Sequence, residues 1–315
     1  MPVLQSGFAP LMLEVPVRRF QHYEVAVKAM ANYQTELCDD ASRRRANSLK
    51  VTDQDQPEEM FCLFPTRPDH PPLAIIGGMG PLAGALAFRQ ACARYQDSRV
   101  VVLYQACSVP DRSTVILGEG RLDTQLCRSM ALRLADAVRL AVDLAPSASL
   151  PAHCIIACNS AHYFWRLMMD DLRRSAAQVE MVSLVESSVE ALGFHSCKRA
   201  LLLTTEGAQT GKVFSTPCLA AGIVFDEPSP TLSRLLMATI FEGMKALDER
   251  RAVELGNELF EAILRAGQDY DCILVGCTEL PLTIDLLRLR GSTEVAAFLS
   301  RVRVVDPFEE ALGHA

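Results

Sequence analysis

Two stretches of the sequence share a pattern that ends in a cysteine, at Cys158 and at Cys277. In each stretch an apolar run of four or five residues ends at the cysteine, and small polar residues follow directly. Such a run indicates a buried parallel strand that leads into a loop. Because ligands bind outside the carboxyl ends of strands in open α/β sheets, both cysteines are expected at a ligand site. Two thiols that face one small ligand can transfer protons on opposite faces of a carbon atom.

Proton transfer of this kind needs one cysteine as thiolate and the other as thiol. A free thiol has a pKa of about 8.5, so the thiolate must be favoured by nearby dipoles or positive charge. We expect a helix N-terminus after each cysteine to supply such a dipole. Asn159, Ser160 and Thr278, with the backbone N–H groups of both turns, are candidates to bind a carboxylate. The alternative is a pair of inert buried thiols, which the matching polar sequences after both cysteines disfavour.

The composition is that of a globular protein with two domains, with 315 residues of which 50% are hydrophobic and 22% charged. A net charge of -7 and a pI near 5.5 give no basic patch for nucleic acid. No run of roughly 18 apolar residues occurs, so no transmembrane helix is expected, and no secretory signal is expected either. The eleven scattered cysteines indicate reduced thiols in a cytoplasmic protein. The close pair Cys154 and Cys158 lacks a partner pair at zinc-site spacing, so no metal site is expected.

Residues 1–72 differ in composition from the rest and contain eight of the seventeen prolines. Apolar residues at helical spacing predict a helix over about residues 21–45, and the polar, proline-rich part after it predicts a linker. This extension is either an appendage to the core or an arm for targeting or partner binding. The sequence leaves both interpretations open.

Strand and helix patterns alternate from residue 73 onward, which predicts an α/β fold with parallel sheets flanked by helices. A glycine-rich turn, Gly77–Pro81, follows the first strand, and Pro81 is expected in the first turn of a helix. We place a first domain at 73–183, with 303–315 returning to it, and a second domain at 184–302.

Four stretches of this region resemble the aspartate/glutamate racemase family, whose members racemise acidic amino acids without pyridoxal phosphate. The stretches are Gly77–Pro81, Pro110–Arg112, Cys158–Tyr163 and Gly276–Leu282. They occur in the family's order, and the resemblance covers about residues 73–315. Ser160 stands where the family usually has threonine, and both residues carry a hydroxyl group.

The resemblance implies two domains related by a pseudo-twofold axis, with an active site in the cleft between them and no cofactor. It implies Cys158 and Cys277 as the acid/base pair, Arg112 and Lys245 as cations for the side-chain carboxylate, and a homodimer. The predicted substrate contacts are Met79, Arg112, Asn159, Ser160, Lys245 and Thr278.

Two further residues have open roles. His162 either orients the surroundings of Cys158 or only packs and forms hydrogen bonds. Glu279 either tunes the proton affinity of Cys277 or caps the helix that follows.

Several rival functions share part of this pattern. Gly78, Gly80 and Ala83 fit a short dinucleotide fingerprint, but the nearest acidic residue, Asp97, precedes the second strand instead of ending it. Another enzyme of the same scaffold, such as a hydantoin racemase, a maleate isomerase or a malonate decarboxylase, would not need both cations. A non-catalytic binding protein would not need both cysteines.

Overall fold

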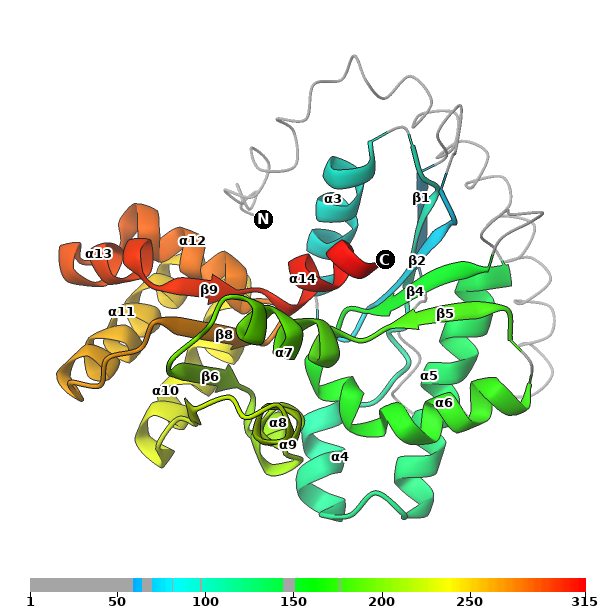
Figure 1. Cartoon of the computed structure of the whole chain (residues 1–315), viewed down its shortest axis with the longest axis horizontal. Helices are drawn as coiled ribbons and strands as arrows, with labels where there is room; N and C mark the ends of the chain where they lie inside the picture. The colour runs from blue at the N-terminus through cyan, green and yellow to red at the C-terminus, as the bar shows by residue number, and fades with distance from the viewer. Residues whose placement is uncertain (1–58, 64–69, 81, 97, 144–150, 176) are drawn as a thin grey trace, which may run out of the picture.

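The computed structural model describes residues 59–63, 70–80, 82–96, 98–143, 151–175 and 177–315. The predicted helix at 21–45 and the predicted place of Pro81 lie outside the described residues. The described chain forms two lobes, each built on its own sheet (Figure 1). This confirms the predicted α/β fold. None of the described helices is both long and apolar enough to cross a membrane.

The first sheet has five strands, in the order β1-β3-β2-β4-β5. They are β1 (Glu59–Leu63), β3 (Val101–Gln105), β2 (Leu73–Gly77), β4 (Ala152–Ile156) and β5 (Val179–Val182). All neighbours pair in parallel except β1, which is antiparallel to β3. Successive side chains of a strand point to opposite faces, so Ala74 and Ile76 pack on one face and Leu73 and Ile75 on the other.

Helices cover both faces of this sheet, which explains why its central strands are continuous apolar runs. On one face lie α5 (Gln125–Asp143) and α6 (Trp165–Arg174), and on the other lie α3 (Ala83–Tyr95) and α14 (Pro307–His314).

The second sheet has four parallel strands, in the order β7-β6-β8-β9. They are β7 (Phe225–Asp226), β6 (Ala200–Thr204), β8 (Cys272–Gly276) and β9 (Arg303–Val305). One face is covered by α10 (Pro230–Ala238), α11 (Glu249–Arg265), α12 (Leu280–Arg290) and α13 (Thr293–Arg301). The other is covered by α7 (Leu184–Phe194), α8 (Glu206–Thr210) and α9 (Ser215–Ala220).

Two parts of the predicted domain organisation need correction. The strand β1 lies within the predicted linker, yet it pairs with β3 along its whole length. Residues Arg303–Val305 pair with β8 of the second sheet and so do not return to the first. Only the helix after them packs on the first lobe, where the Tyr95 hydroxyl donates to the carbonyl of Leu312 at 2.8 Å. In both cases the strand with which the segment pairs decides the sheet to which it belongs. The local sequence does not show which strand that is.

The register of the central strands brings their carboxyl ends together. Ile76 of β2 lies beside Ile156 of β4, and Thr204 of β6 lies beside Gly276 of β8. The glycine turn after β2 passes very close to the chain after β3. A Cβ atom at Gly78 would lie 2.6 Å from the backbone nitrogen of Ala106, and Gly78 has a φ of +78°, so only glycine fits.

The two lobes also meet through α8 and α4 (Arg112–Glu119), which lie side by side in Figure 1. A Cβ atom at Gly207 of α8 would lie 2.6 Å from the Cα of Ser113, so glycine permits this close approach. Both helices begin at carboxyl edges of the sheets, and the cleft between the lobes therefore opens beside them.

Candidate active site

One cleft collects residues that follow strands of both sheets. It contains Cys158, Cys277, Glu279 and all six predicted substrate contacts. The complete lining is Met79, Asp111, Arg112, Ser113, Cys158, Asn159, Ser160, Thr205, Lys245, Gly276, Cys277, Thr278 and Glu279. Of the ten residues predicted for the site, His162 alone does not line the cleft. The structure thus brings the predicted residues together, while their chemical roles stay predictions.

Cys158 lies just beyond β4, at the residue before a short 3-10 helix, Asn159–Phe164. Its side chain is buried but lines the cleft. The neighbouring Asn159 is also buried, and neither its amide nitrogen nor its amide oxygen has a partner among the described residues. A buried amide without a partner costs free energy unless a ligand satisfies it. Asn159 is therefore well suited to hold a polar ligand.

A hydroxyl pair links the two lobes at this point. The Oγ atom of Ser160 lies 2.9 Å from the Oγ1 atom of Thr205, the residue between β6 and α8. Thr205 also caps α8, because its side chain accepts a hydrogen bond from the backbone N–H of Ala208. The contact fixes the orientation of Ser160 across the cleft.

Cys277 follows β8 and is almost fully buried. Its thiol donates a hydrogen bond to the Oε2 atom of Glu279 at 3.2 Å. Burial raises the pKa of Cys277 well above the ordinary value, and the negative charge of Glu279 raises it further, while Lys245 opposes the shift. The cleft without substrate therefore favours Cys277 as a thiol.

Of the two roles left open for Glu279, its side chain does not perform the helix cap. It occupies the N-cap position of α12, but its side chain forms no capping hydrogen bond. The carboxylate points instead at Cys277, and its Oε1 atom is buried without a partner in the described chain. A Cβ atom at Gly80 would overlap this oxygen, so the glycine turn leaves the space that the carboxylate occupies.

Arg112 is the first residue of α4. Its terminal nitrogens donate to the backbone carbonyls of Met79, Val109 and Pro110. Only the buried Nε atom lacks a partner among described residues. The guanidinium therefore ties the glycine turn after β2 to the start of α4, and three of its five N–H donors are used in doing so.

Lys245 is the more available cation of the cleft. It follows a π-helical segment, Thr239–Met244, and its Nζ atom lies 4.2 Å from the centre of the Phe241 ring. It forms no hydrogen bond or ion pair with any residue that the structure describes, yet it is close enough to Cys277 and Asp111 to affect their pKa values. An ammonium in this position can receive a carboxylate.

Four residues of the cleft were not predicted from the sequence. They are Asp111, Ser113, Thr205 and Gly276. Burial opposes ionisation of Asp111, but the Thr114 N–H, Arg112 and Lys245 together hold its pKa below the usual range. Asp111 is thus a carboxylate that could receive a ligand ammonium group. Two features of the sequence could have identified site residues here. Asp111 stands at the capping position before α4, and Thr205 stands at the end of a strand.

His162 lies behind Cys158 as a neutral ring. Its Nε2 atom accepts a hydrogen bond from the backbone N–H of Leu184 at 3.1 Å, so the proton must be on Nδ1. That Nδ1 atom lies 3.1 Å from the carbonyl oxygen of Cys158, to which it donates. Burial lowers the pKa of His162 to about 4, and the ring stacks on Trp165. His162 therefore positions the backbone of Cys158 and is not a proton carrier.

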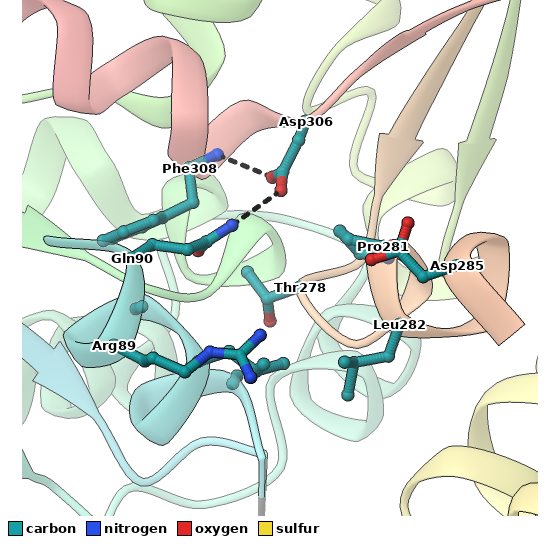
Figure 2. Close-up of a pocket in the computed structure, with 11 residues that line it drawn as sticks. Arg89, Gln90, Thr278, Pro281, Leu282, Asp285, Asp306 and Phe308 are labelled. Carbon is teal, nitrogen blue, oxygen red and sulfur yellow. Dashed lines mark hydrogen bonds between the residues drawn. The ribbon is translucent and has the colours of Figure 1, made fainter. Parts of the chain in front are cut away.

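A second groove lies beside the cleft, between α3 of the first lobe and α12 of the second (Figure 2). Thr278 lines both the groove and the cleft. Deeper in the groove, Asp306 accepts hydrogen bonds from the backbone N–H of Phe308 at 3.0 Å and from Gln90 at 3.4 Å. Burial raises the pKa of Asp306 to about 6.

The family model of Asp/Glu/hydantoin racemases matches residues 76–315. The chain belongs to this family. Solved structures with the same fold include an aspartate racemase from Picrophilus torridus, with 19% identity, a TM-score of 0.58, and coverage of 78% of this chain and 92% of that one. An aspartate racemase homologue from Pyrococcus horikoshii OT3 has 19% identity, a TM-score of 0.56, and coverage of 78% and 97%.

A glutamate racemase isoform from Bacillus anthracis is also similar, with 13% identity, a TM-score of 0.51, and coverage of 78% of this chain and 80% of that one. At these identities the solved structures establish the two-lobed fold. The predicted resemblance to the family is confirmed by the family model and by these structures together.

Replacing His162 by glutamine should weaken the acid sensitivity of the fold. The unfolded chain protonates His162 below about pH 6.5, whereas the folded chain does so only near pH 4, so stability falls as the pH drops through this window. We expect His162 to account for about 2 kcal/mol of the wild-type loss in unfolding free energy between pH 8 and pH 5. Urea unfolding at both pH values measures this difference.

The control is His314→Gln, at the exposed end of α14. Asp306 contributes with the opposite sign between about pH 4 and pH 6, but it does so equally in all three proteins. Identical pH dependence in wild type and His162→Gln would show that folding does not lower the pKa of His162.

Replacing Glu279 by glutamine should make Cys277 more reactive. The amide keeps a hydrogen-bond acceptor but removes the negative charge that raises the pKa of Cys277. The thiolate fraction, and with it the rate of alkylation by iodoacetamide near pH 7.5, should increase about tenfold for each unit by which the pKa falls. Mass spectrometry of the Cys277 peptide measures the rate. The Cys158 peptide of the same sample is the reference for access to the cleft, and an unchanged ratio of the two rates would refute this role of Glu279.

Proposed function

We propose that this protein racemises an acidic amino acid, aspartate or glutamate, by exchanging the Cα proton between Cys158 and Cys277 without a cofactor. The observation that carries the proposal is that two buried cysteines, each at the carboxyl end of a central strand in a different lobe, line one cleft. A thiolate on one side takes the α-proton while the opposite thiol delivers its own proton to the other face. The stereocentre inverts, and the two cysteines exchange protonation states.

The charges around Cys277 indicate which cysteine starts as the proton donor and which as the base. Burial and Glu279 both favour Cys277 as the thiol, so it is the proton donor in the first turnover. The two-base mechanism then requires Cys158 as the base. When Cys277 must act as the base in the reverse direction, the nearby Lys245 stabilises its thiolate.

The polar groups of the cleft match the three charged groups of an acidic amino acid. Asn159 and Thr278 lie beside the two cysteines and are suited to the α-carboxylate. Asp111 is suited to the ammonium group, and Lys245 to the side-chain carboxylate. Arg112 contributes mainly by holding Met79 and the start of α4 in place. A neutral substrate such as a hydantoin would leave Lys245 without a partner.

The predicted homodimer and the predicted cytoplasmic location follow from the sequence and the family resemblance. Both stay predictions for this chain.

The proposal predicts deuterium exchange at Cα of aspartate or glutamate in D2O. Wild-type protein should exchange both enantiomers with inversion, as proton NMR and chiral chromatography would detect. Cys158→Ser and Cys277→Ser should each lose racemisation, because a serine hydroxyl is a far weaker acid than a thiol and cannot serve as the base. Each variant can retain exchange without inversion for the single enantiomer whose proton faces the remaining cysteine.

Cys218→Ser is the matched control, because Cys218 is buried in the second lobe but does not line the cleft. This variant should racemise like wild type. Absence of exchange on all four substrates would reject acidic amino-acid racemisation, and hydantoins and substituted malonates would then be the next substrates to test.

Replacing Lys245 by methionine should raise KM for acidic substrates by about 10–100-fold, the loss expected for a hydrogen bond to a charged group. Lys245→Arg keeps the positive charge and should restore most of the affinity. Steady-state kinetics on aspartate and glutamate measures both variants. An unchanged KM in Lys245→Met would show that this ammonium does not hold the substrate.

A further inference from the structure

Three metal-binding side chains meet at the end of β8 that points away from the cleft. Cys272 is the first residue of β8, Asp271 precedes it, and Cys197 lies in the turn before β6. Their two sulfur atoms and a carboxylate oxygen all lie within 4.8 Å of one another. Within the described ranges, no other group of three or more His, Cys, Asp or Glu side chains comes together in this way.

The carboxylate of this cluster is held in a fixed orientation. Its Oδ2 atom accepts a hydrogen bond from the backbone N–H of Lys198 at 2.8 Å, and Oδ1 accepts one from that of Arg199 at 2.9 Å. Cys197 donates its thiol proton to the same Oδ1 atom at 3.4 Å. A proton therefore occupies the position between sulfur and oxygen where a cation could replace it.

We propose that Cys197, Asp271 and Cys272 bind a soft divalent cation of the zinc class. Thiolate ligands select such ions, and two thiolates with one carboxylate leave a fourth position for water in a tetrahedral site. Cys272 is buried while Asp271 is exposed, so one ligand is fixed in the interior and an ion can reach the site from solvent past the other. Hydrogen bonds to the carboxylate are the outer support that metal ligands usually have.

The surroundings balance the charge of the occupied site. Two thiolates and a carboxylate carry three negative charges, of which a divalent ion neutralises two. Arg303 lies directly beside Cys272 in the β8–β9 pairing and offsets the third. Binding releases the two thiol protons, one from each cysteine.

The cluster is separate from the catalytic cleft, since the two share no residue. A bound ion would fasten the turn before β6 to the start of β8, the strand that ends at Cys277. The sequence predicted no metal site, because Cys197 and Cys272 are far apart in the chain and belong to no spacing motif. The β6–β8 pairing brings them together.

The test uses the full chain with Cys158→Ser and Cys277→Ser, reduced with a phosphine, so that the cleft cannot bind the metal. Titration with Co2+ should give one saturable equivalent with the visible absorption of tetrahedral thiolate ligation, and Zn2+ should displace it. Calorimetry in buffers of different ionisation enthalpy should show release of about two protons. Zn2+ should also raise the unfolding temperature.

Adding Cys197→Ser should abolish the cobalt absorption and weaken Zn2+ binding by about 100-fold or more, and Asp271→Asn should weaken it by at least about tenfold. Cys218→Ser, a buried cysteine of the same lobe, should change nothing. Asp271→Asn keeps an exposed side chain of the same shape, so it tests the site even if Cys197→Ser fails to fold. The proposal is overturned if no equivalent binds, if binding survives Cys197→Ser, or if Asp271→Asn binds the metal as tightly as the parent protein.

Discussion

Parallel pairing of the central strands is the constraint on which the site depends. In each lobe two neighbouring strands end in register, Ile76 beside Ile156 and Thr204 beside Gly276. The chain segments that leave these strands must therefore emerge side by side at one edge of each sheet. Because the two lobes meet through α4 and α8, both edges border the same cleft. A shift of one residue in the register of β4 or β8 would turn the side chains of that strand, and the cysteine after it, toward the opposite face of the sheet.

Electrostatics then decides what the two thiols can do. Cys277 is buried against the carboxylate of Glu279, which favours the thiol, while Lys245 favours the thiolate. Burial and Glu279 outweigh Lys245, so the pKa of Cys277 is raised and its surroundings favour the form that donates a proton. An acidic substrate would alter that balance, because its side-chain carboxylate would neutralise the cation. Under the proposed function, substrate binding would therefore change the proton affinity of Cys277.

Two polar side chains at the cleft hold the backbone around it in place. His162 bridges the carbonyl of Cys158 and the start of α7, and Arg112 bridges the glycine turn and α4. Both use a polar side chain to satisfy backbone groups that would otherwise be buried without a partner. The same principle holds at the far end of β8, where Asp271 accepts two backbone N–H groups. These contacts join segments that are distant in the sequence.

The sequence by itself determined the α/β fold class, the strands that lead to the two cysteines and nine of the thirteen residues that line the cleft. Buried parallel strands and polar strand ends leave a local pattern that needs no knowledge of the neighbouring chain. The tertiary structure alone decided the pairing of β1 with β3, the direction of the Glu279 side chain, the engagement of the Arg112 guanidinium and the meeting of Cys197 with Cys272. Each depends on which distant segment packs against the residue, because hydrogen-bond partners and burial are set by contacts that local periodicity does not encode.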